Sequence, residues 1–155
     1  MTIAMCPGSF DPPTSGHIDL IDRARAMFDK VIVAVIDNPS KRPMFTPTER
    51  AELFREIYGD TIDVTIFQGL LVEHARDMEV DVLVKGIRNG IDFEYEFQMA
   101  HMNRRLSGVE TLFLPTSPSV SYISSSLVKE VARLGGPVSS LVPDVVENAL
   151  KERLP

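Results

Sequence analysis

The sequence predicts an α/β fold: a single doubly wound, Rossmann-like domain over residues 1–155, with a five-stranded parallel sheet, helices on both faces and an extra C-terminal helix. Three observations predict it. Apolar runs alternate with segments of helical periodicity along the whole chain, which is the pattern of right-handed β-α-β units. The run Val31–Ile36 is almost continuously apolar, as expected of a strand covered on both faces. A length of 155 residues, of which 44% are hydrophobic and 25% charged, suits one globular core.

Five short apolar runs are expected to form the strands. The expected strands are Ile3–Cys6, Val31–Ile36, Asp63–Phe67, Val80–Lys85 and Thr111–Leu114. In the common strand order 3-2-1-4-5, the first and fourth strands flank the point where the order reverses, and ligands bind beyond the carboxyl ends of the strands there. The segments that follow the strands are therefore where we expect the function to lie.

The helices are predicted from apolar residues at spacings of three and four and from their end signals. In the first helix, Ile18, Ile21 and Ala24 form an apolar stripe. The second has Thr46 as its cap and Glu49 at the third helical position, the pattern of a capping box. The expected helices are His17–Phe28, Thr46–Tyr58, Leu70–Met78, Phe93–Leu106, Ser124–Leu134 and a last helix from after Pro143 to about Arg153.

Composition excludes several classes of protein. A net charge of -6 argues against a nucleic-acid-binding surface, which needs clustered Lys and Arg. No apolar run approaches the roughly 20 residues that span a membrane, and the first residues lack the pattern of a signal peptide. The single Cys6 cannot form an internal disulfide and suits a reducing cytoplasm. A phosphate ligand must therefore meet a local cluster of positive charge.

The turn after the first strand, Pro7–His17, contains two glycines and three prolines and is expected to be rigid. It lacks both the dinucleotide-binding glycine pattern and the Gly-Lys-Ser/Thr of a P-loop. Gly16 allows a ligand to approach the backbone. His17 falls in the first turn of a helix, where free N–H groups and the helix dipole favour an anion. The alternative is a helix-capping turn with a solvent-exposed His; the context of strand, turn and helix favours the anion site.

Basic residues follow the second and fourth strands. Lys41 is a compact charge on the loop after the second strand and is expected to overhang the ligand. The alternative is that Lys41 and its neighbour Arg42 are only solvated, as most basic pairs in loops are. Lys85 ends the fourth strand and Arg88 follows it; Lys85 suits an acceptor phosphate, and Arg88 can fork across two nucleotide phosphate oxygens. The alternative for this pair is a charged β-turn.

Three serines, Ser124–Ser126, open the helix after the fifth strand. One serine suffices to cap a helix, so the run is expected to leave spare hydroxyls beside free N–H groups; the alternative is a cap and no more. Two such helix starts and several cations at one edge of the sheet predict a triphosphate site. His101 is expected on the surface or at a subunit contact, where Met99 and Met102 form an apolar edge, and His74 is expected to be structural.

Together these motifs resemble the bacterial phosphopantetheine adenylyltransferases over essentially the whole chain. The Gly-His turn and Ile-Ser-Ser are shared across the wider nucleotidyltransferase superfamily. Two narrower motifs, Asp92–Glu96 and Ala100–Asn103, select the family. The motifs are Pro7-Gly8-Ser9-Phe10-Asp11-Pro12, Thr14-Ser15-Gly16-His17, Lys41 with Pro43-Met44-Phe45, Lys85-Gly86-Ile87-Arg88, Asp92-Phe93-Glu94-Tyr95-Glu96, Met99-Ala100-His101-Met102-Asn103, and Ile123-Ser124-Ser125-Ser126-Leu127-Val128-Lys129-Glu130-Val131.

The resemblance implies transfer of the adenylyl group of ATP to 4′-phosphopantetheine, giving 3′-dephospho-CoA and pyrophosphate, with Mg²⁺ carried by ATP and a cytoplasmic homohexamer. It implies catalytic roles for His17, which stabilises the transition state, Lys41 and Arg88. The implied acceptor-binding residues are Ser9, Lys41, Leu71 and Lys85. The implied ATP-binding residues are Ser9, Phe10, His17, Gly86, Ile87, Arg88, Glu96, Val120, Ser121, Tyr122, Ile123, Ser124, Ser125 and Ser126. No direct metal ligand is implied.

The chain departs from the family pattern at Ser9, where Thr is common, and at Lys85, where many members carry Arg. Lys keeps the charge and loses the bidentate fork, which puts acceptor affinity in doubt. Thr14 replaces the first His of the superfamily motif, which counts against a cytidylyltransferase. Two alternatives remain open: an adenylyltransferase for nicotinamide mononucleotide, and a nucleotide-sensing module without turnover.

Overall fold

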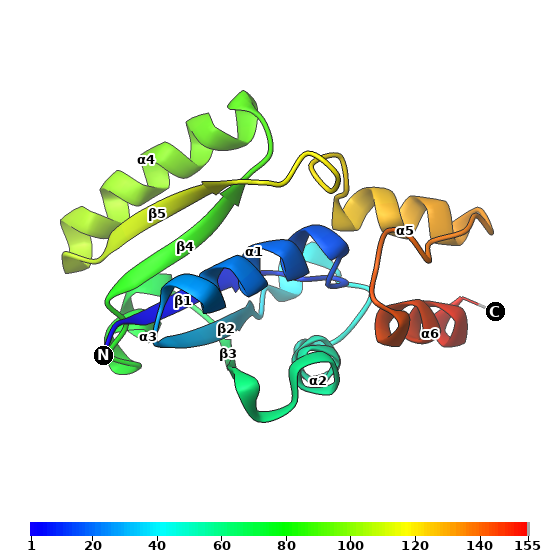
Figure 1. Cartoon of the computed structure of the whole chain (residues 1–155), viewed down its shortest axis with the longest axis horizontal. Helices are drawn as coiled ribbons and strands as arrows, with labels where there is room; N and C mark the ends of the chain where they lie inside the picture. Colours follow the sequence, from blue (N-terminus) through cyan, green and yellow to red (C-terminus); the bar gives the residue numbers. More distant parts are fainter. Residues whose placement is uncertain (155) are drawn as a thin grey trace.

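The computed structural model of the chain describes residues 1–154 and is built on one sheet of five parallel strands (Figure 1). The strands lie in the order β3-β2-β1-β4-β5, as the sequence predicts. Their bounds are β1 (Ile3–Gly8), β2 (Lys30–Ile36), β3 (Asp63–Phe67), β4 (Val82–Ile87) and β5 (Glu110–Pro115).

The register shows where the sheet opens. β1 pairs with β2 along its whole length, from Ile3 to Gly8. Its pairing with β4 within the described residues covers Ala4 with Val82 and Met5 with Leu83. Beyond Met5 the two strands separate, so the carboxyl ends of β1 and β4 lie on either side of an opening at the point where strand order reverses. This is the place where doubly wound sheets bind ligands.

Helices cover both faces of the sheet, as predicted. Their bounds are α1 (Ser15–Met27), α2 (Pro47–Tyr58), α3 (Leu71–Asp77), α4 (Gly90–Ser107), α5 (Ser125–Arg133) and α6 (Asp144–Arg153), with short 3₁₀ turns at η1 (Pro39–Lys41) and η2 (Gly59–Thr61). On one face, Ile21 of α1 and Phe54 of α2 are fully buried against the sheet. On the other, Ala75 of α3 packs with Met5 and Leu83.

A separate apolar cluster joins the C-terminal helices to α2. Val128 of α5 and Val146 and Leu150 of α6 are buried with Leu53 of α2 and with Phe45, which precedes α2. Figure 1 shows α5 and α6 beyond the carboxyl ends of the strands. The cluster therefore brings the start of α5 to the edge of the sheet where β1 and β4 separate.

β1 and β4 extend two residues beyond their predicted ends, and three predicted starts are wrong for physical reasons. α1 begins at Ser15, two residues before His17, because Thr14 is its cap. α4 begins at Gly90, before the predicted Phe93, because the side chain of Asn89 accepts from the N–H of Asp92 and caps the helix there. β4 begins at Val82, because the N–H of Val80 donates to the carbonyl of Ala75 and closes the end of α3 instead of joining the sheet.

Candidate functional site

A cleft of about 350 Å³ opens at the carboxyl ends of β1 and β4, beside the first turns of α1 and α5. It collects most of the residues that the sequence predicts for ATP. Its lining consists of Pro7, Gly8, Ser9, Phe10, Thr14, Gly16, His17, Asp19, Leu20, Arg23, Lys85, Gly86, Arg88, Glu96, Thr116, Ile123, Ser124, Ser125 and Ser126. A larger hollow of about 440 Å³ lies between α2 and α6, but none of the predicted residues lines it.

A second cavity of about 310 Å³ adjoins the first and shares Ser9, Ser125 and Ser126 with it. The second cavity contains Lys41, which the sequence predicts for the acceptor. Two neighbouring cavities with a common wall are the arrangement that a reaction between two phosphate-bearing substrates needs, because both reactants must meet at one atom.

His17 is held at the start of α1 by a reciprocal capping box. The hydroxyl of Thr14 accepts from the N–H of His17 (3.4 Å), and the N–H of Thr14 donates to Nδ1 of His17 (3.0 Å). A backbone N–H only donates, so Nδ1 carries the lone pair and the imidazole proton lies on Nε2. The helix-capping role and the predicted ligand-facing role therefore coexist: Nδ1 caps the helix, and Nε2–H remains for the cleft.

The imidazole of His17 is neutral near pH 7. Burial, and secondarily the charge of Arg88, lower the pKa of His17 to about 4. The ring of Phe10 packs edge-on against the imidazole at 4.9 Å between centroids, and Phe10 packs in turn against Phe54. A neutral ring whose position is fixed on both sides can donate one hydrogen bond in a set direction.

Gly8 leaves the space that Phe10 occupies. A Cβ at Gly8 would lie 2.9 Å from the Phe10 ring, closer than real side chains approach. Phe10 itself has a φ of 52°, in the left-handed region that non-glycine residues seldom adopt. The predicted contact residue Phe10 is thus 5% exposed and lies beneath the cleft, where it supports His17.

The cations at the carboxyl end of β4 are already paired within the chain. Nζ of Lys85 lies 2.6 Å from Oε2 of Glu96, and Nε of Arg88 lies 3.1 Å from Oδ2 of Asp92. Lys85 and Arg88 reach the cleft, as predicted, and the acidic residues of α4 hold them there. The sequence predicted Lys85 and Glu96 for different substrates; the structure brings them into one ion pair.

The expected spare hydroxyls at α5 are reduced to one. Oγ of Ser124 accepts from the N–H of Leu127 and caps the helix, and Oγ of Ser125 donates to the carbonyl of Pro12 (2.8 Å). The run was expected to leave two hydroxyls beyond the cap, and this expectation is wrong. Within residues 1–154, Ser126 is the member of the run whose hydroxyl makes no hydrogen bond.

Some predicted residues lie outside both cavities. Leu71 opens α3 and packs against the core. Ile87 ends β4, where its carbonyl accepts from the backbone N–H and the hydroxyl of Thr116. Val120, Ser121 and Tyr122 form the turn before α5, in which Tyr122 is 62% exposed. These roles remain predictions.

The two other histidines stay away from the cleft. His74 stacks on Phe67 and shares a hydrogen bond with Thr65, and His101 is exposed on α4, where it packs edge-on against Phe97. Their predicted structural and surface positions agree with this placement.

Three charged residues beside the second cavity were not among the predicted site residues: Asp11, Arg50 and Lys129. Asp11 accepts from the N–H groups of Met44 and Phe45 and pairs with Lys129 at 3.0 Å. These hydrogen bonds and the Lys129 charge hold the pKa of Asp11 below its usual value, against an opposing effect of burial. Arg50 lies three and four residues before the buried Leu53 and Phe54 of α2, so it belongs to the buried side of the helix. A cation at such a position is the sequence signal that could have indicated a functional role for Arg50.

Comparisons with known proteins agree with this geometry. A family model described as cytidylyltransferase-like matches residues 5–131. The chain is 54% identical over 156 residues to the phosphopantetheine adenylyltransferase of a Nocardioides species, covering 99% of this chain and 98% of the relative. It is 53% identical to the proteins of the same name from Caldanaerobacter subterraneus subsp. tengcongensis and Streptomyces coelicolor, with the same coverage.

Solved structures support the fold alone. A structure described as a putative nicotinate-nucleotide adenylyltransferase from Vibrio parahaemolyticus matches with a TM-score of 0.69 at 20% identity, covering 99% of this chain and 95% of that one. A lipopolysaccharide core biosynthesis protein from Thermoplasma volcanium matches with a TM-score of 0.57 at 22% identity, covering 76% and 97%.

Proposed function

The chain belongs to the phosphopantetheine adenylyltransferase family, and on this basis we propose how its cleft transfers the adenylyl group of ATP to 4′-phosphopantetheine. The products are 3′-dephospho-CoA and pyrophosphate. The observation that carries the proposal is the Thr14–His17 capping box, which presents a neutral Nε2–H donor in a cleft at the switch point of the sheet.

The reaction is a direct displacement at the α-phosphorus of ATP. An oxygen of the acceptor phosphate forms the new P–O bond in line with the bond to pyrophosphate, which breaks as pyrophosphate leaves with its electron pair. The acceptor phosphate is largely a dianion near pH 7, so the attack needs no general base and no covalent intermediate. Catalysis then consists of positioning two substrates and stabilising the charge that builds up on the transferring phosphoryl group.

His17 is the proposed transition-state stabiliser. Its Nδ1 is occupied by the N–H of Thr14 and its pKa is about 4, so it neither accepts a proton from the acceptor nor carries a full charge near neutral pH. What it offers is the Nε2–H, aimed by its helix and by Phe10. A donor held in this way stabilises developing negative charge without reorganising during the reaction.

The two cavities divide the substrates. We place ATP in the cleft lined by His17, Arg88 and Ser126, and the acceptor phosphate toward Lys41 in the second cavity. Ser9 lies on the wall that both share. Lys85 lines the ATP cleft and not the second cavity, so we place its contact with the acceptor phosphate where the two cavities join. There it would exchange part of its contact with Glu96, whose Oε2 lies 2.6 Å from Nζ.

Mg²⁺ is proposed to arrive with ATP. Within residues 1–154 no group of three or more His, Cys, Asp or Glu side chains is arranged to hold a metal, so the donor set fits an ion bound mainly by phosphate oxygens. Such an ion would neutralise part of the negative charge of the triphosphate.

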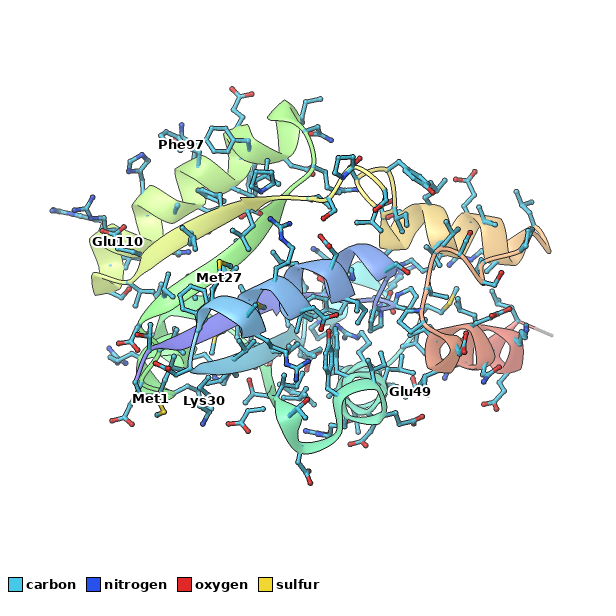
Figure 2. The ribbon with its side chains drawn as sticks, viewed as in Figure 1. Met1, Met27, Lys30, Glu49, Phe97 and Glu110 are labelled. Carbon is cyan, nitrogen blue, oxygen red and sulfur yellow. The ribbon has the colours of Figure 1, made fainter. Side chains whose placement is uncertain are left out.

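Assembly and location are further parts of the proposal. α4 exposes Ile91, Tyr95, Met99, Met102 and Leu106 along one side, and Phe93 and Phe97 on another, of which Phe97 is labelled in Figure 2. Exposed apolar surface of this kind supports a subunit contact, here the proposed homohexamer. No helix in the described part of the chain is long and apolar enough to cross a membrane. A cytoplasmic location rests on the acidic, single-cysteine composition and on the family.

The function is tested by measuring pyrophosphate release from ATP with two acceptors in parallel. Turnover with 4′-phosphopantetheine and none with nicotinamide mononucleotide is expected. Turnover with the mononucleotide alone would assign the chain to the alternative acceptor, and ATP binding without any turnover would indicate a sensing module.

A further inference from the structure

Arg50 lies beneath the second cavity, with 1% of its surface exposed. Its guanidinium donates to four backbone carbonyls. Nη1 donates to Ser9 (2.6 Å) and Ile36 (2.9 Å), and Nε donates to Phe45 (3.0 Å) and Thr46 (3.3 Å). One side chain of α2 thus connects the carboxyl ends of β1 and β2 to the segment that enters α2.

These carbonyls enclose the loop that carries Lys41. Ile36 is the last residue of β2, and Phe45 lies just before the Thr46 cap of α2. Arg50 therefore fixes both ends of the loop and ties them to Ser9, the residue on the wall between the two cavities. Asp11 adds a second anchor at the same end, through the N–H groups of Met44 and Phe45.

The charge of Arg50 is not neutralised by a direct partner. Within residues 1–154, no carboxylate oxygen lies within ion-pair distance of it; Asp11 and Asp37 act on it only from further away. A buried cation held by neutral carbonyls is costly, and an apolar residue would fit the stripe of α2 at lower cost. The place of this cation below a phosphate-binding cavity gives a reason for it, because a fixed positive charge there favours an anionic ligand.

We propose that Arg50 is a positioning residue for the acceptor: it fixes the Ser9 backbone and both ends of the Lys41 loop, and so sets where the acceptor phosphate binds. The inference rests on the proposed function. It predicts a larger effect on the acceptor than on ATP. Arg50 holds both ends of the Lys41 loop, but on the ATP side it reaches only the Ser9 backbone and contacts neither β4 nor α5, which carry Arg88 and Ser126.

The test is Arg50→Lys, assayed by pyrophosphate release with ATP and 4′-phosphopantetheine. Lysine keeps the charge, but a single ammonium cannot reach all four carbonyls. The KM for phosphopantetheine is expected to rise by about tenfold or more, while the KM for ATP changes by less than about threefold. Hydrogen exchange measured by mass spectrometry is expected to become faster in residues 37–45 and to stay unchanged in α4.

Three further variants separate positioning from stability. Arg55→Lys changes an exposed arginine of the same helix that donates to the carbonyl of Val64, and should leave both KM values unchanged. Val80→Ala removes buried volume on the opposite face of the sheet and provides a stability-matched control. If Arg50→Lys is insoluble, Arg50→Gln retains an amide donor without burying a charge, and the same split between the KM values is expected.

The outcomes are distinct. Suppose that the wild-type protein turns over, and that Arg50→Lys or Arg50→Gln either lowers kcat with both KM values unchanged or raises both KM values equally. Arg50 is then only structural: the inference is wrong, and the proposed function stands. If the wild-type protein does not turn over 4′-phosphopantetheine at all, the proposed function fails and this inference fails with it.

Discussion

The backbone N–H of Thr14 donates to Nδ1 of His17 across 3.0 Å, and this one hydrogen bond fixes the tautomer of the imidazole. The proton must then lie on Nε2, on the side of the ring away from Thr14. The helix cap and the functional group are therefore the same side chain. A change at the start of α1 is expected to alter catalysis even where it leaves the cleft walls intact.

The titration of His17 is the first prediction. A pKa of about 4 in the folded chain, against 6.5 in an ordinary environment, means that the unfolded chain binds the extra proton first as the pH falls. The stability that neutral His17 contributes is thus fully present above pH 6.5 and is lost as the pH falls from 6.5 toward 4.

Two measurements check this. In NMR titrations, the resonance that disappears in His17→Gln should titrate near pH 4. In urea unfolding, the wild-type protein should lose stability relative to His17→Gln over the same acidic interval. A His17 resonance that titrates near 6.5 would show that the imidazole is not buried and neutral as described.

Gly8→Ala is expected to lower kcat without unfolding the protein. The added Cβ would lie 2.9 Å from the Phe10 ring, so Phe10 must shift and the edge-on support of His17 is lost. A displaced catalytic group of this kind costs up to about 10²-fold in rate. The measurement is steady-state pyrophosphate release, combined with thermal unfolding.

Gly90→Ala is the matched control, because a Cβ at Gly90 meets nothing within 4 Å. It should leave kcat unchanged. Equal losses in the two variants, or wild-type turnover in Gly8→Ala, would mean that Phe10 does not set the position of His17.

Lys85→Arg is expected to lower the KM for phosphopantetheine by about threefold to tenfold. A guanidinium can keep one prong on Glu96 and offer the other to phosphate, whereas the ammonium of Lys85 is held at 2.6 Å by Glu96 alone. Lys151→Arg, an exposed lysine paired with Glu147 in α6, is the control. An unchanged or higher KM in Lys85→Arg would count against an acceptor role for this side chain.

Met102→Glu tests the proposed contact through α4. The apolar side chains exposed along this helix are Ile91, Phe93, Tyr95, Phe97, Met99, Met102 and Leu106. A buried, unpaired carboxylate among them should break an assembly. Sedimentation velocity is expected to give a hexamer for the wild-type protein and smaller species for Met102→Glu, while Met27→Glu, an exposed methionine at the end of α1, leaves the assembly intact. A monomeric wild-type protein would refute the contact.

The fold was predictable because the apolar runs, the helical stripes and the capping residues all indicate the same structure. The apolar run in β2 and the stripes of the helices specify a parallel sheet covered on both sides, and the Thr46–Glu49 capping box forms as expected. The helix starts that were wrong depend on single caps. Asn89 starts α4 early through one hydrogen bond, which apolar periodicity cannot register.

The site was predictable in its location but not in its internal pairing. The carboxyl ends of parallel strands meet at one edge of the sheet. The sequence therefore predicts that His17, Lys85 and Arg88 lie close together. Which charges neutralise each other depends on rotamers and on the angle of α4. The Lys85–Glu96 and Asp11–Lys129 pairs join residues from different elements, and no local pattern specifies them.

The most direct test is the kcat of His17→Ala, with His74→Ala as a matched control outside both cavities. Alanine removes the Nε2–H donor, whereas glutamine would retain an amide donor. The loss should lower kcat by about 10²–10³, or roughly 2.7–4 kcal/mol of transition-state stabilisation, with little change in the KM for ATP. His74→Ala should turn over at the wild-type rate. A folded His17→Ala protein with wild-type kcat would contradict the claim that this histidine stabilises adenylyl transfer.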